Sequence, residues 1–172
     1  MIEVLKTKFS LPPRYCKFLL TCEPQDDAEL VTPAERLLLL SADQLDEEQK
    51  GFATDDSGTL IPHPSTNAWR PSWIIIGHSS LLGDPYFLEV ADADAEGDCP
   101  VYTAMSGTEA WQKQLCASSF AMFLRILAVS VELAKDFDLD DYDQDNEQLF
   151  RDSLGPKIRQ YDPAAVKAGH WT

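Results

Sequence analysis

The sequence lacks any long apolar run. Its unbroken apolar stretches are short, such as Leu37 to Leu40, whereas about 18–20 apolar residues are needed to span a bilayer. The N-terminal residues, Met1 to Lys6, are not followed by the apolar segment of a signal peptide. From these absences we expect a cytoplasmic protein that does not contact a membrane.

Cysteine is also scarce and unpatterned. The four cysteines, Cys16, Cys22, Cys99 and Cys116, form no CxxC pair, and no histidine stands at metal-ligand spacing from them. A zinc site or a disulfide framework needs such spacing. We therefore expect four reduced thiols in or near the core, and no metal or cofactor.

Basic residues are missing from two segments of the chain, 71–112 and 136–147, which carry seven acidic residues each. Together they hold 14 of the 29 acidic residues, and elsewhere 15 acidic residues face 14 basic ones, so the net charge of −15 is concentrated there. Phosphate contacts require clustered Lys and Arg, so we do not expect a nucleic-acid partner. Acidic runs usually serve as solvated surface, but a basic protein partner also fits them.

What the sequence does contain is enough apolar residues, 44%, for the core of one domain of 172 residues. Short apolar runs and alternating patterns predict strands at Arg36–Ser41, Trp73–Ile76, Tyr86–Val90, Val101–Met105 and Thr108–Lys113. The last two strands are expected to form a hairpin through Ser106-Gly107. Strands grouped between helices, without βαβ alternation, predict an α+β fold with a single mixed, mostly antiparallel sheet flanked by helices.

Helices are predicted from apolar periodicity and capping residues. They are expected after Pro12-Pro13 up to Leu20, at Gln44–Lys50, at Phe120–Phe137 behind a cap at Ser118 or Ser119, and at Asn146–Leu154 with a stop at Gly155-Pro156. The Phe120 helix is expected to lie across one face of the sheet. The segment from Phe52 to Pro71 is predicted to be a long loop and the tail to be irregular, with Trp171 docking.

The order of these elements resembles the SUKH superfamily, also called the SMI1/KNR4 family. The resemblance rests on Leu11-Pro12-Pro13-Arg14-Tyr15, Leu38 to Gly51, Trp73 to Gly77, Gly83-Asp84, Pro100-Val101-Tyr102 and Ala117 to Leu124. The family's Asn-Gly-Gly turn is replaced here by Cys22-Glu23-Pro24-Gln25. The resemblance predicts an SMI1/KNR4-like domain at residues 1–135, with an acidic segment and C-terminal extension, residues 136–172, packed on it.

Two short patterns in the sequence partly match a catalytic motif and a metal-binding motif. Gly77-His78-Ser79-Ser80-Leu81 nearly spells the nucleophile elbow GxSxG, but the fifth residue is Leu81 and a strand follows instead of a helix. The run from Asp141 to Asp152 places acidic residues at positions 1, 3, 5 and 12 of a calcium loop, but Asn146 stands where the turn needs glycine. A calcium site there is left open.

The resemblance implies a non-catalytic protein-binding domain, most often a bacterial immunity protein that binds and neutralises a cognate toxin. The alternative is a regulatory scaffold with several partners. We expect a monomer or weak homodimer that presents carboxylates to a basic partner. The expected partner-binding residues are Asp138, Asp140, Asp141, Asp143, Asp145 and Glu147, followed by Asp92, Asp94, Glu96 and Asp98.

Overall fold

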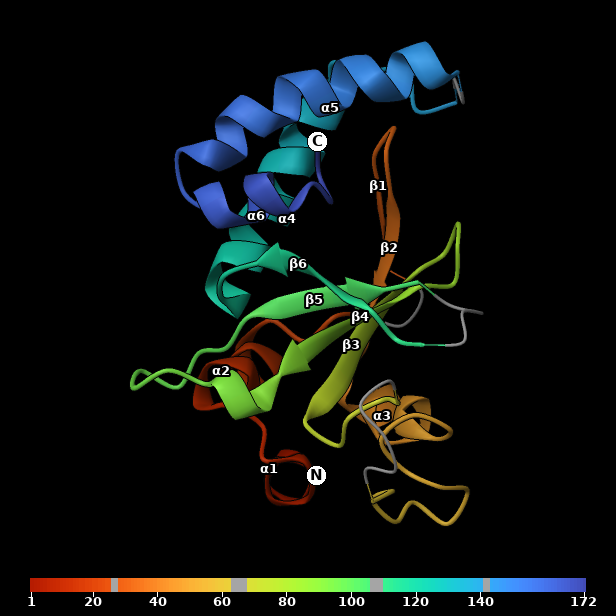
Figure 1. Cartoon of the computed structure of the whole chain (residues 1–172), viewed down its shortest axis with the longest axis vertical. Coiled ribbons are helices and arrows are strands. Elements are labelled where there is room, and N and C mark those ends of the chain that lie inside the picture. Colours follow the sequence, from red (N-terminus) through yellow and green to blue (C-terminus); the bar gives the residue numbers. More distant parts are fainter. Residues whose placement is uncertain (26–27, 63–67, 106–109, 141–142) are drawn as a thin grey trace.

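A computed structural model of the chain describes residues 1–25, 28–62, 68–105, 110–140 and 143–172. Its centre is a six-stranded sheet in the order β1-β2-β3-β4-β5-β6, and every neighbouring pair of strands is antiparallel (Figure 1). The strands are β1 Glu29–Val31, β2 Arg36–Leu39, β3 Trp73–Ser79, β4 Pro85–Glu89, β5 Val101–Ala104 and β6 Lys113–Ala117. The predicted α+β class is confirmed.

The helices surround this sheet. They are α1 Ile2–Phe9, α2 Pro13–Thr21, α3 Ala42–Leu45, α4 Phe120–Ala134, α5 Gln144–Arg159 and α6 Pro163–Ala168, with short 3-10 turns η1 Glu47–Gln49 and η2 Val90–Asp92. Helices α2 and α4 meet through the rings of Tyr15 and Phe120, whose centroids are 5.0 Å apart. Figure 1 shows α5 and α6, in blue, at one end of the molecule, with α6 next to β6 and α5 farther from the sheet.

The two faces of the sheet bury different side chains because side chains alternate along a strand. On one face Tyr86 of β4 contacts Phe123 of α4, which confirms that this helix lies across the sheet. Phe87 points to the other face, where it packs with Trp69 and Trp73 under the long loop. The loop is therefore anchored by the indole ring of Trp69, whose Nε1 also donates a hydrogen bond to the Trp73 carbonyl.

Several local predictions are confirmed with physical detail. Ser119 caps α4 by accepting a hydrogen bond from the Met122 N–H, and Ser41 forms a capping box with Gln44. At Gly77 the structure adds a constraint from packing, because a Cβ there would lie 2.5 Å from the Leu38 carbonyl oxygen on the neighbouring strand. The docking of Trp171 is confirmed, since its side chain is buried.

Other predictions are wrong. The last strand is Lys113–Ala117, not Thr108–Lys113, because Trp111 packs against Phe52 and Trp69 instead of pairing in the sheet. The expected turn at Ser106-Gly107 lies outside the described residues. The helix at 42–50 starts earlier than expected and becomes 3-10 after Leu45. Helices α1 and α6 and strand β1 were not predicted.

The predicted helix stop at Gly155-Pro156 is also wrong, because α5 continues through both residues to Arg159. Proline removes one intrahelical hydrogen bond and usually breaks a helix. Here the buried apolar face of α5, made by Phe150, Leu154 and Ile158, continues on both sides of the proline. Burial of that face outweighs the local preference for a break.

Candidate partner-binding surfaces

The first predicted group of acidic residues lies where α4 gives way to α5, and we call it the acidic corner. Its predicted members among the described residues are Asp138, Asp140, Asp143, Asp145 and Glu147, and Asp136 precedes them in the same segment. All but Glu147 are exposed, and Asp141 lies outside the described residues. The amide of Asn146 donates a hydrogen bond to the Asp138 carbonyl across 2.9 Å, which ties the two ends of the segment together.

Part of the acidic corner has a local structural role. The Asp143 side chain caps α5 by accepting a hydrogen bond from the Asp145 N–H, and negative charge is favourable at a helix N-terminus. Glu147 pairs with Arg151 across 2.8 Å. No Lys or Arg occurs between Lys135 and Arg151, so the exposed carboxylates follow one another along the chain without an intervening base. Two exposed leucines, Leu139 and Leu149, lie within the same stretch.

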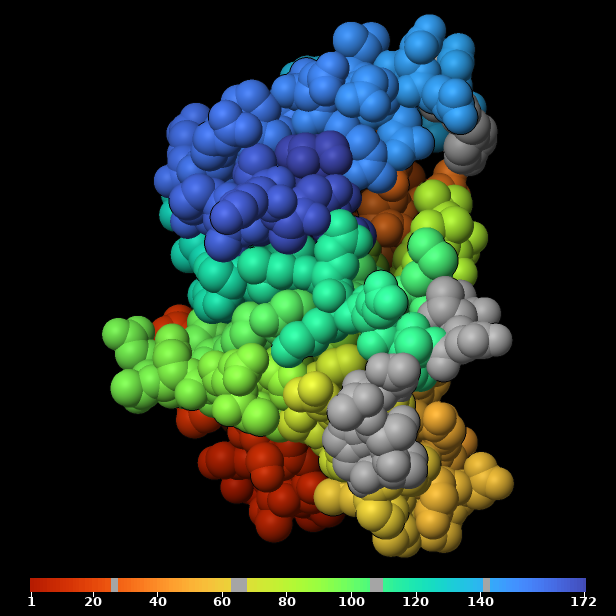
Figure 2. Space-filling model, in the orientation of Figure 1, coloured from red at the N-terminus to blue at the C-terminus, as the bar shows by residue number. Residues whose placement is uncertain are grey.

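The second group lies beside α2: Asp92 is the last residue of η2, and Asp94 and Glu96 lie on the loop between η2 and β5. Arg14 of α2 approaches Glu96 at 3.8 Å, and Asp92 lies 3.9 Å from Lys113. Asp94 accepts hydrogen bonds from the backbone N–H groups of Glu96 and Asp98 and shapes the turn. In Figure 2 this loop projects from one side in light green, away from the blue segment that carries the acidic corner. The two groups therefore form separate surfaces.

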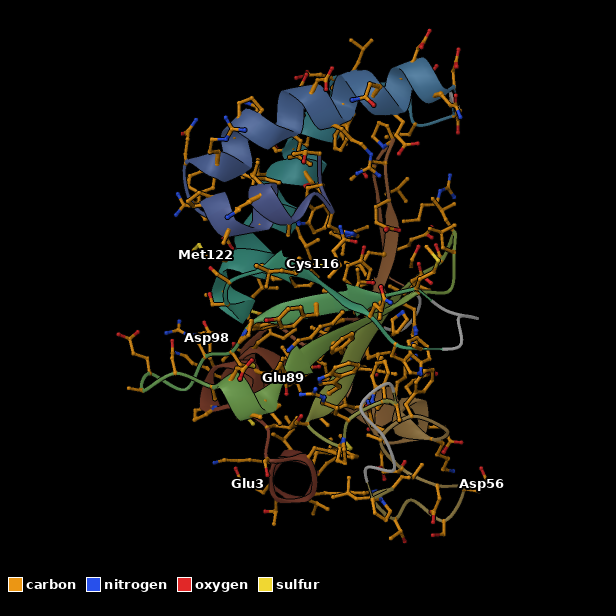
Figure 3. The ribbon with its side chains drawn as sticks, viewed as in Figure 1. Glu3, Asp56, Glu89, Asp98, Cys116 and Met122 are labelled. Atoms are coloured by element: carbon orange, nitrogen blue, oxygen red, sulfur yellow. The ribbon has the colours of Figure 1, made fainter. Side chains whose placement is uncertain are left out.

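Asp98 is not part of an exposed surface. Its side chain is 5% exposed and lies 2.9 Å from the Arg14 Nε. Its carboxylate also accepts hydrogen bonds from the backbone N–H groups of Cys99, Phe120 and Ala121 (Figure 3). Asp98 thus satisfies the otherwise unpaired N–H groups at the start of α4, and this structural role removes it from the predicted partner-binding set.

The residues of the nucleophile-elbow pattern lie within β3 and the turn after it. The Ser79 hydroxyl donates to Glu35 across 2.7 Å, and His78 Nε2 lies 3.0 Å from Glu48. Ser79 and His78 thus contact different carboxylates. The next element of the chain is strand β4. The geometry is that of a β-hairpin and not of the strand–turn–helix that exposes a nucleophile.

Most of the residues of the calcium-loop pattern form part of helix α5. Asp141, its first position, lies outside the described residues, and everything from Gln144 to Asp152 belongs to α5. Asp152 accepts a hydrogen bond from Gln148 on the next turn of the helix. Among the described residues, no group of three or more His, Cys, Asp or Glu side chains is placed to hold a metal ion.

The cysteines are free thiols. Cys16, Cys99 and Cys116 are buried as expected, but Cys22 is exposed, which corrects the prediction for that residue. Burial, together with nearby carboxylates, raises the pKa of Cys99 to about 12. Burial also raises the pKa of Cys116 well above its ordinary value. Neither thiol is suited to act as a nucleophile at neutral pH.

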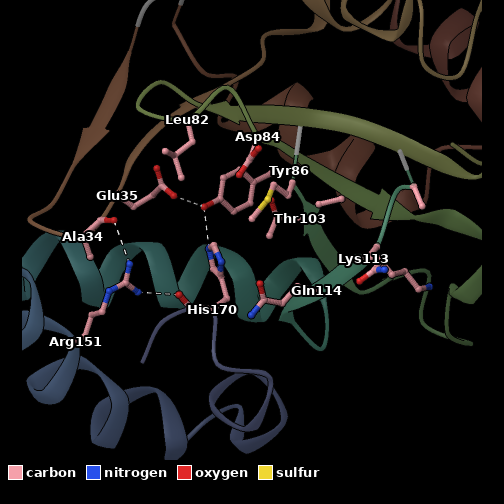
Figure 4. A pocket seen from close by; sticks show the side chains of 14 residues that line it. Ala34, Glu35, Leu82, Asp84, Tyr86, Thr103, Lys113, Gln114, Arg151 and His170 are labelled. Atoms are coloured by element: carbon pink, nitrogen blue, oxygen red, sulfur yellow. Dashed lines mark hydrogen bonds between the residues drawn. The ribbon is translucent and has the colours of Figure 1, made fainter. Parts of the chain in front are cut away.

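Sequence reasoning missed a cavity of about 770 Å³ between the sheet and the C-terminal segment (Figure 4). Residues of the β1–β2 and β3–β4 turns and of strands β4, β5 and β6 line it, together with Arg151 and His170. Its floor contains a chain of three side chains from distant parts of the sequence. The Tyr86 hydroxyl donates to a Glu35 oxygen across 2.7 Å, and His170 Nε2 lies 2.9 Å from the same hydroxyl. Since this hydroxyl donates to Glu35, it accepts from His170.

Arg151 closes the side of this cavity next to the acidic corner. Its guanidinium donates to the backbone carbonyls of His170 and Ala34, at 2.8 and 3.4 Å, in addition to its pairing with Glu147. Burial beside this cation lowers the pKa of His170 to about 4. The histidine is therefore uncharged at neutral pH.

A family model described as SMI1 / KNR4 family (SUKH-1) matches residues 5–126. The chain belongs to the SMI1/KNR4 family. No curated protein and no solved structure matches it. The match ends inside α4, so the family model covers the whole sheet but neither α5 nor α6.

The acidic corner and half of the cavity floor therefore lie outside the SMI1/KNR4 match. His170 and Arg151 come from the extension, whereas Glu35 and Tyr86 come from the matched region. No local pattern marks these four residues, because they are brought together only by the packing of the extension against the sheet.

No helix among the described residues is long and apolar enough to cross a membrane.

Proposed function

We propose that this chain is a non-catalytic immunity protein that binds and neutralises a cognate, basic toxin in the cytoplasm, acting as a monomer or weak homodimer. Membership of the SMI1/KNR4 family supports a binding role. The observation that carries the proposal further is the acidic corner, which concentrates exposed carboxylates with no intervening base. Such a surface attracts a basic partner before contact and rejects acidic ones.

The composition of the acidic corner fits an interface as well as a solvated surface. Leu139 and Leu149 are 37% and 61% exposed within the acidic stretch. Stable interfaces commonly place apolar side chains at their centre and charged ones at the rim. In this arrangement the carboxylates accelerate the encounter with the toxin, and the leucines slow the dissociation of the complex.

A regulatory scaffold is the second candidate. The observation that favours it is the second acidic loop, Asp92 to Glu96, which lies on a different side of the molecule from the acidic corner. Two separated surfaces of the same charge allow two partners to bind at once. A scaffold would bind several proteins weakly, whereas an immunity protein binds one partner tightly.

The deciding experiment uses the full chain, tagged, as bait in a lysate of its native cells at low salt. The captured proteins are washed with a NaCl gradient and identified by mass spectrometry. Each captured protein is then expressed alone and together with the chain in a host that lacks both. One stoichiometric basic partner that stops growth alone, and is harmless with the chain, supports the immunity function. Several substoichiometric partners without toxicity would overturn it in favour of the scaffold.

A further inference from the structure

The outer side of α5 carries a stripe of exposed residues. Its members follow one another at spacings of four, three, four and three residues: Asp145, Leu149, Asp152, Pro156 and Arg159. Residues at these spacings lie along one face of an α-helix and form the seam of a helix pair. The other face of α5, with Phe150, Leu154 and Ile158, is buried, and α5 packs against α4 and α6. Figure 1 shows α5 along the upper end of the molecule, with α4 and α6 below it.

The two ends of this stripe carry opposite charges. Asp145 lies in the first turn of α5, and Arg159 lies in the last turn together with the exposed Lys157. Among the described residues, no ion pair involves Lys157 or Arg159. The helix dipole favours this order of charges, but it gives no reason for Leu149, which is 61% exposed on the same stripe.

The charges of the stripe match a second copy of the same stripe that runs in the opposite direction. In an antiparallel pair of α5 helices, Asp145 of each copy faces Arg159 of the other, and a two-fold axis passes near Asp152. Leu149 and Pro156 lie three and four residues from that axis, so they face each other across it. A parallel pair would instead place like charges together. The antiparallel contact uses one surface twice and closes at two copies.

We propose that two copies of this chain pair through antiparallel α5 helices, and that the resulting dimer covers part of the surface that binds the toxin. Asp145 belongs to the acidic corner, and Leu149 lies in the same stretch. The dimer and the toxin therefore use the same residues, and toxin binding separates the two copies. The inference locates the interface of the weak homodimer, and for this competition it rests on the proposed function.

Three features keep the dimer weak. A pair of 16-residue helices is about 24 Å long, so its contact area is smaller than the roughly 1,600 Å² of a standard interface. The Asp152 carboxylates of the two copies lie near each other at the axis and repel. The net charge of −15 also opposes association, but screening at physiological salt limits this repulsion to about 8 Å.

The first test is sedimentation equilibrium of the purified full chain, up to high micromolar concentration at physiological salt. The mass should rise towards that of two chains and no further. Leu149→Glu should weaken the dimer at least about 10-fold, because it brings an unpaired charge into the contact. Leu20→Glu adds the same charge at a residue 66% exposed on α2 and should leave the dimer unchanged. A monomer at every concentration, growth beyond two chains, or equal effects of both variants would overturn the proposal.

Charge reversal tests the antiparallel geometry. Asp145→Lys and Arg159→Glu should each remain monomeric when alone, because each faces a like charge in its own dimer. An equimolar mixture of the two variants should form a heterodimer, since Lys at 145 then faces Glu at 159 and the unchanged Asp145 faces the unchanged Arg159. Circular dichroism checks that both variants are folded. A mixture of folded variants that stays monomeric would contradict the antiparallel pair.

The central aspartate provides an opposite prediction. Asp152→Asn removes the like-charge contact at the axis and should strengthen the dimer about 3-fold, the size of a repulsive pair on a helix surface. A weaker dimer would place Asp152 outside the contact.

The captured toxin tests the competition. Added to the dimeric chain, it should give a complex with one copy of each protein, measured by light scattering after gel filtration. A complex that keeps two paired copies would overturn the covering of the toxin surface. A dimer in a chain that captures no toxin leaves the self-pairing standing and removes the proposed function. Capture of a toxin by a chain that never dimerises has the opposite meaning.

Discussion

The indole Nε1 of Trp171 donates a hydrogen bond to the backbone carbonyl of Cys116 across 2.7 Å, although the two residues are 55 positions apart. Cys116 belongs to β6, at the edge of the sheet, and Trp171 is the penultimate residue. The bond joins the part of the chain matched by the family model to the extension. Because of this bond, we expect the two parts of the chain to unfold together.

Trp171→Ala should lower the free energy of unfolding by about 3–5 kcal/mol, because it leaves a cavity and an unpaired carbonyl. Leu20→Ala, at a residue 66% exposed on α2, should change it by less than about 0.5 kcal/mol. Urea unfolding followed by tryptophan fluorescence and by circular dichroism measures both. A single shared transition is expected. Two separate transitions would mean that residues 136–172 unfold on their own.

The free energy of unfolding should depend on pH through the protonation of His170. Its pKa is lowered to about 4 in the folded chain by burial and by Arg151, whereas the unfolded chain binds this proton near pH 6.5. Between these values the unfolded state holds more protons, so stability falls as the pH is lowered from about 6.5 to 4 and is unaffected by this group above that range. Because His170 is only partly buried as a residue, we expect a loss of about 2 kcal/mol in unfolding free energy, less than the pKa difference alone would give.

The contribution of His170 is isolated by comparing the wild-type chain with His170→Gln. Carboxylates titrate over part of the same range, and the difference between the two pH profiles of unfolding free energy removes their effect. The variant should show a shallower decline between pH 6.5 and 4. Parallel profiles would mean that protonation of this histidine is not linked to folding.

Asp98 gives a prediction about folding and not about binding. Asp98→Ala should cost about 3 kcal/mol of unfolding free energy, because it leaves N–H groups at the start of α4 and the Arg14 guanidinium without their buried acceptor. Glu96→Ala removes an exposed carboxylate on the same loop, paired with the same arginine at 3.8 Å, and should cost less than about 1 kcal/mol. Thermal denaturation at neutral pH compares them, and a similar cost for both would contradict this role.

The central strands and α4 were predictable because their signals are local. Trp73 to Ile76 is a short apolar run, and Ser119 followed by apolar periodicity marks the start of α4. The strand near Trp111 was misplaced because an aromatic residue in an alternating pattern favours a strand, and only the three-dimensional packing shows that Trp111 belongs with Phe52. The same limitation applies to Pro156, whose local effect is overridden by burial of α5.

The candidate sites differ in the same way: those made of residues adjacent in sequence were predictable, and those made of residues from distant segments were not. The acidic corner was predictable because its members are adjacent in sequence and only their exposure depended on the fold. Asp98 looked the same in sequence, but its neighbours in space, Arg14 and Phe120, come from two other helices. The cavity was not predictable, since Glu35, Tyr86 and His170 become neighbours only when the extension packs on the sheet.

The two acidic surfaces make different predictions for the kinetics of toxin binding. Replacing Asp138, Asp140 and Asp143 together by Asn keeps the size of each side chain and the capping ability of residue 143. The association rate at low salt should fall about 10-fold, because long-range attraction is lost. The dissociation rate should change less, and the decline of the association rate with NaCl should become shallower.

The matched control changes Asp92 and Asp94 to Asn and Glu96 to Gln, which removes the same charge from the other side of the molecule. Electrostatic steering depends on where charge lies relative to the interface, and screening at physiological salt limits its range to about 8 Å. The control should therefore alter the association rate much less, when measured by surface plasmon resonance over a series of NaCl concentrations. A larger effect of the control would place the toxin on the loop beside α2, and the acidic corner would then be only the capped and solvated start of α5.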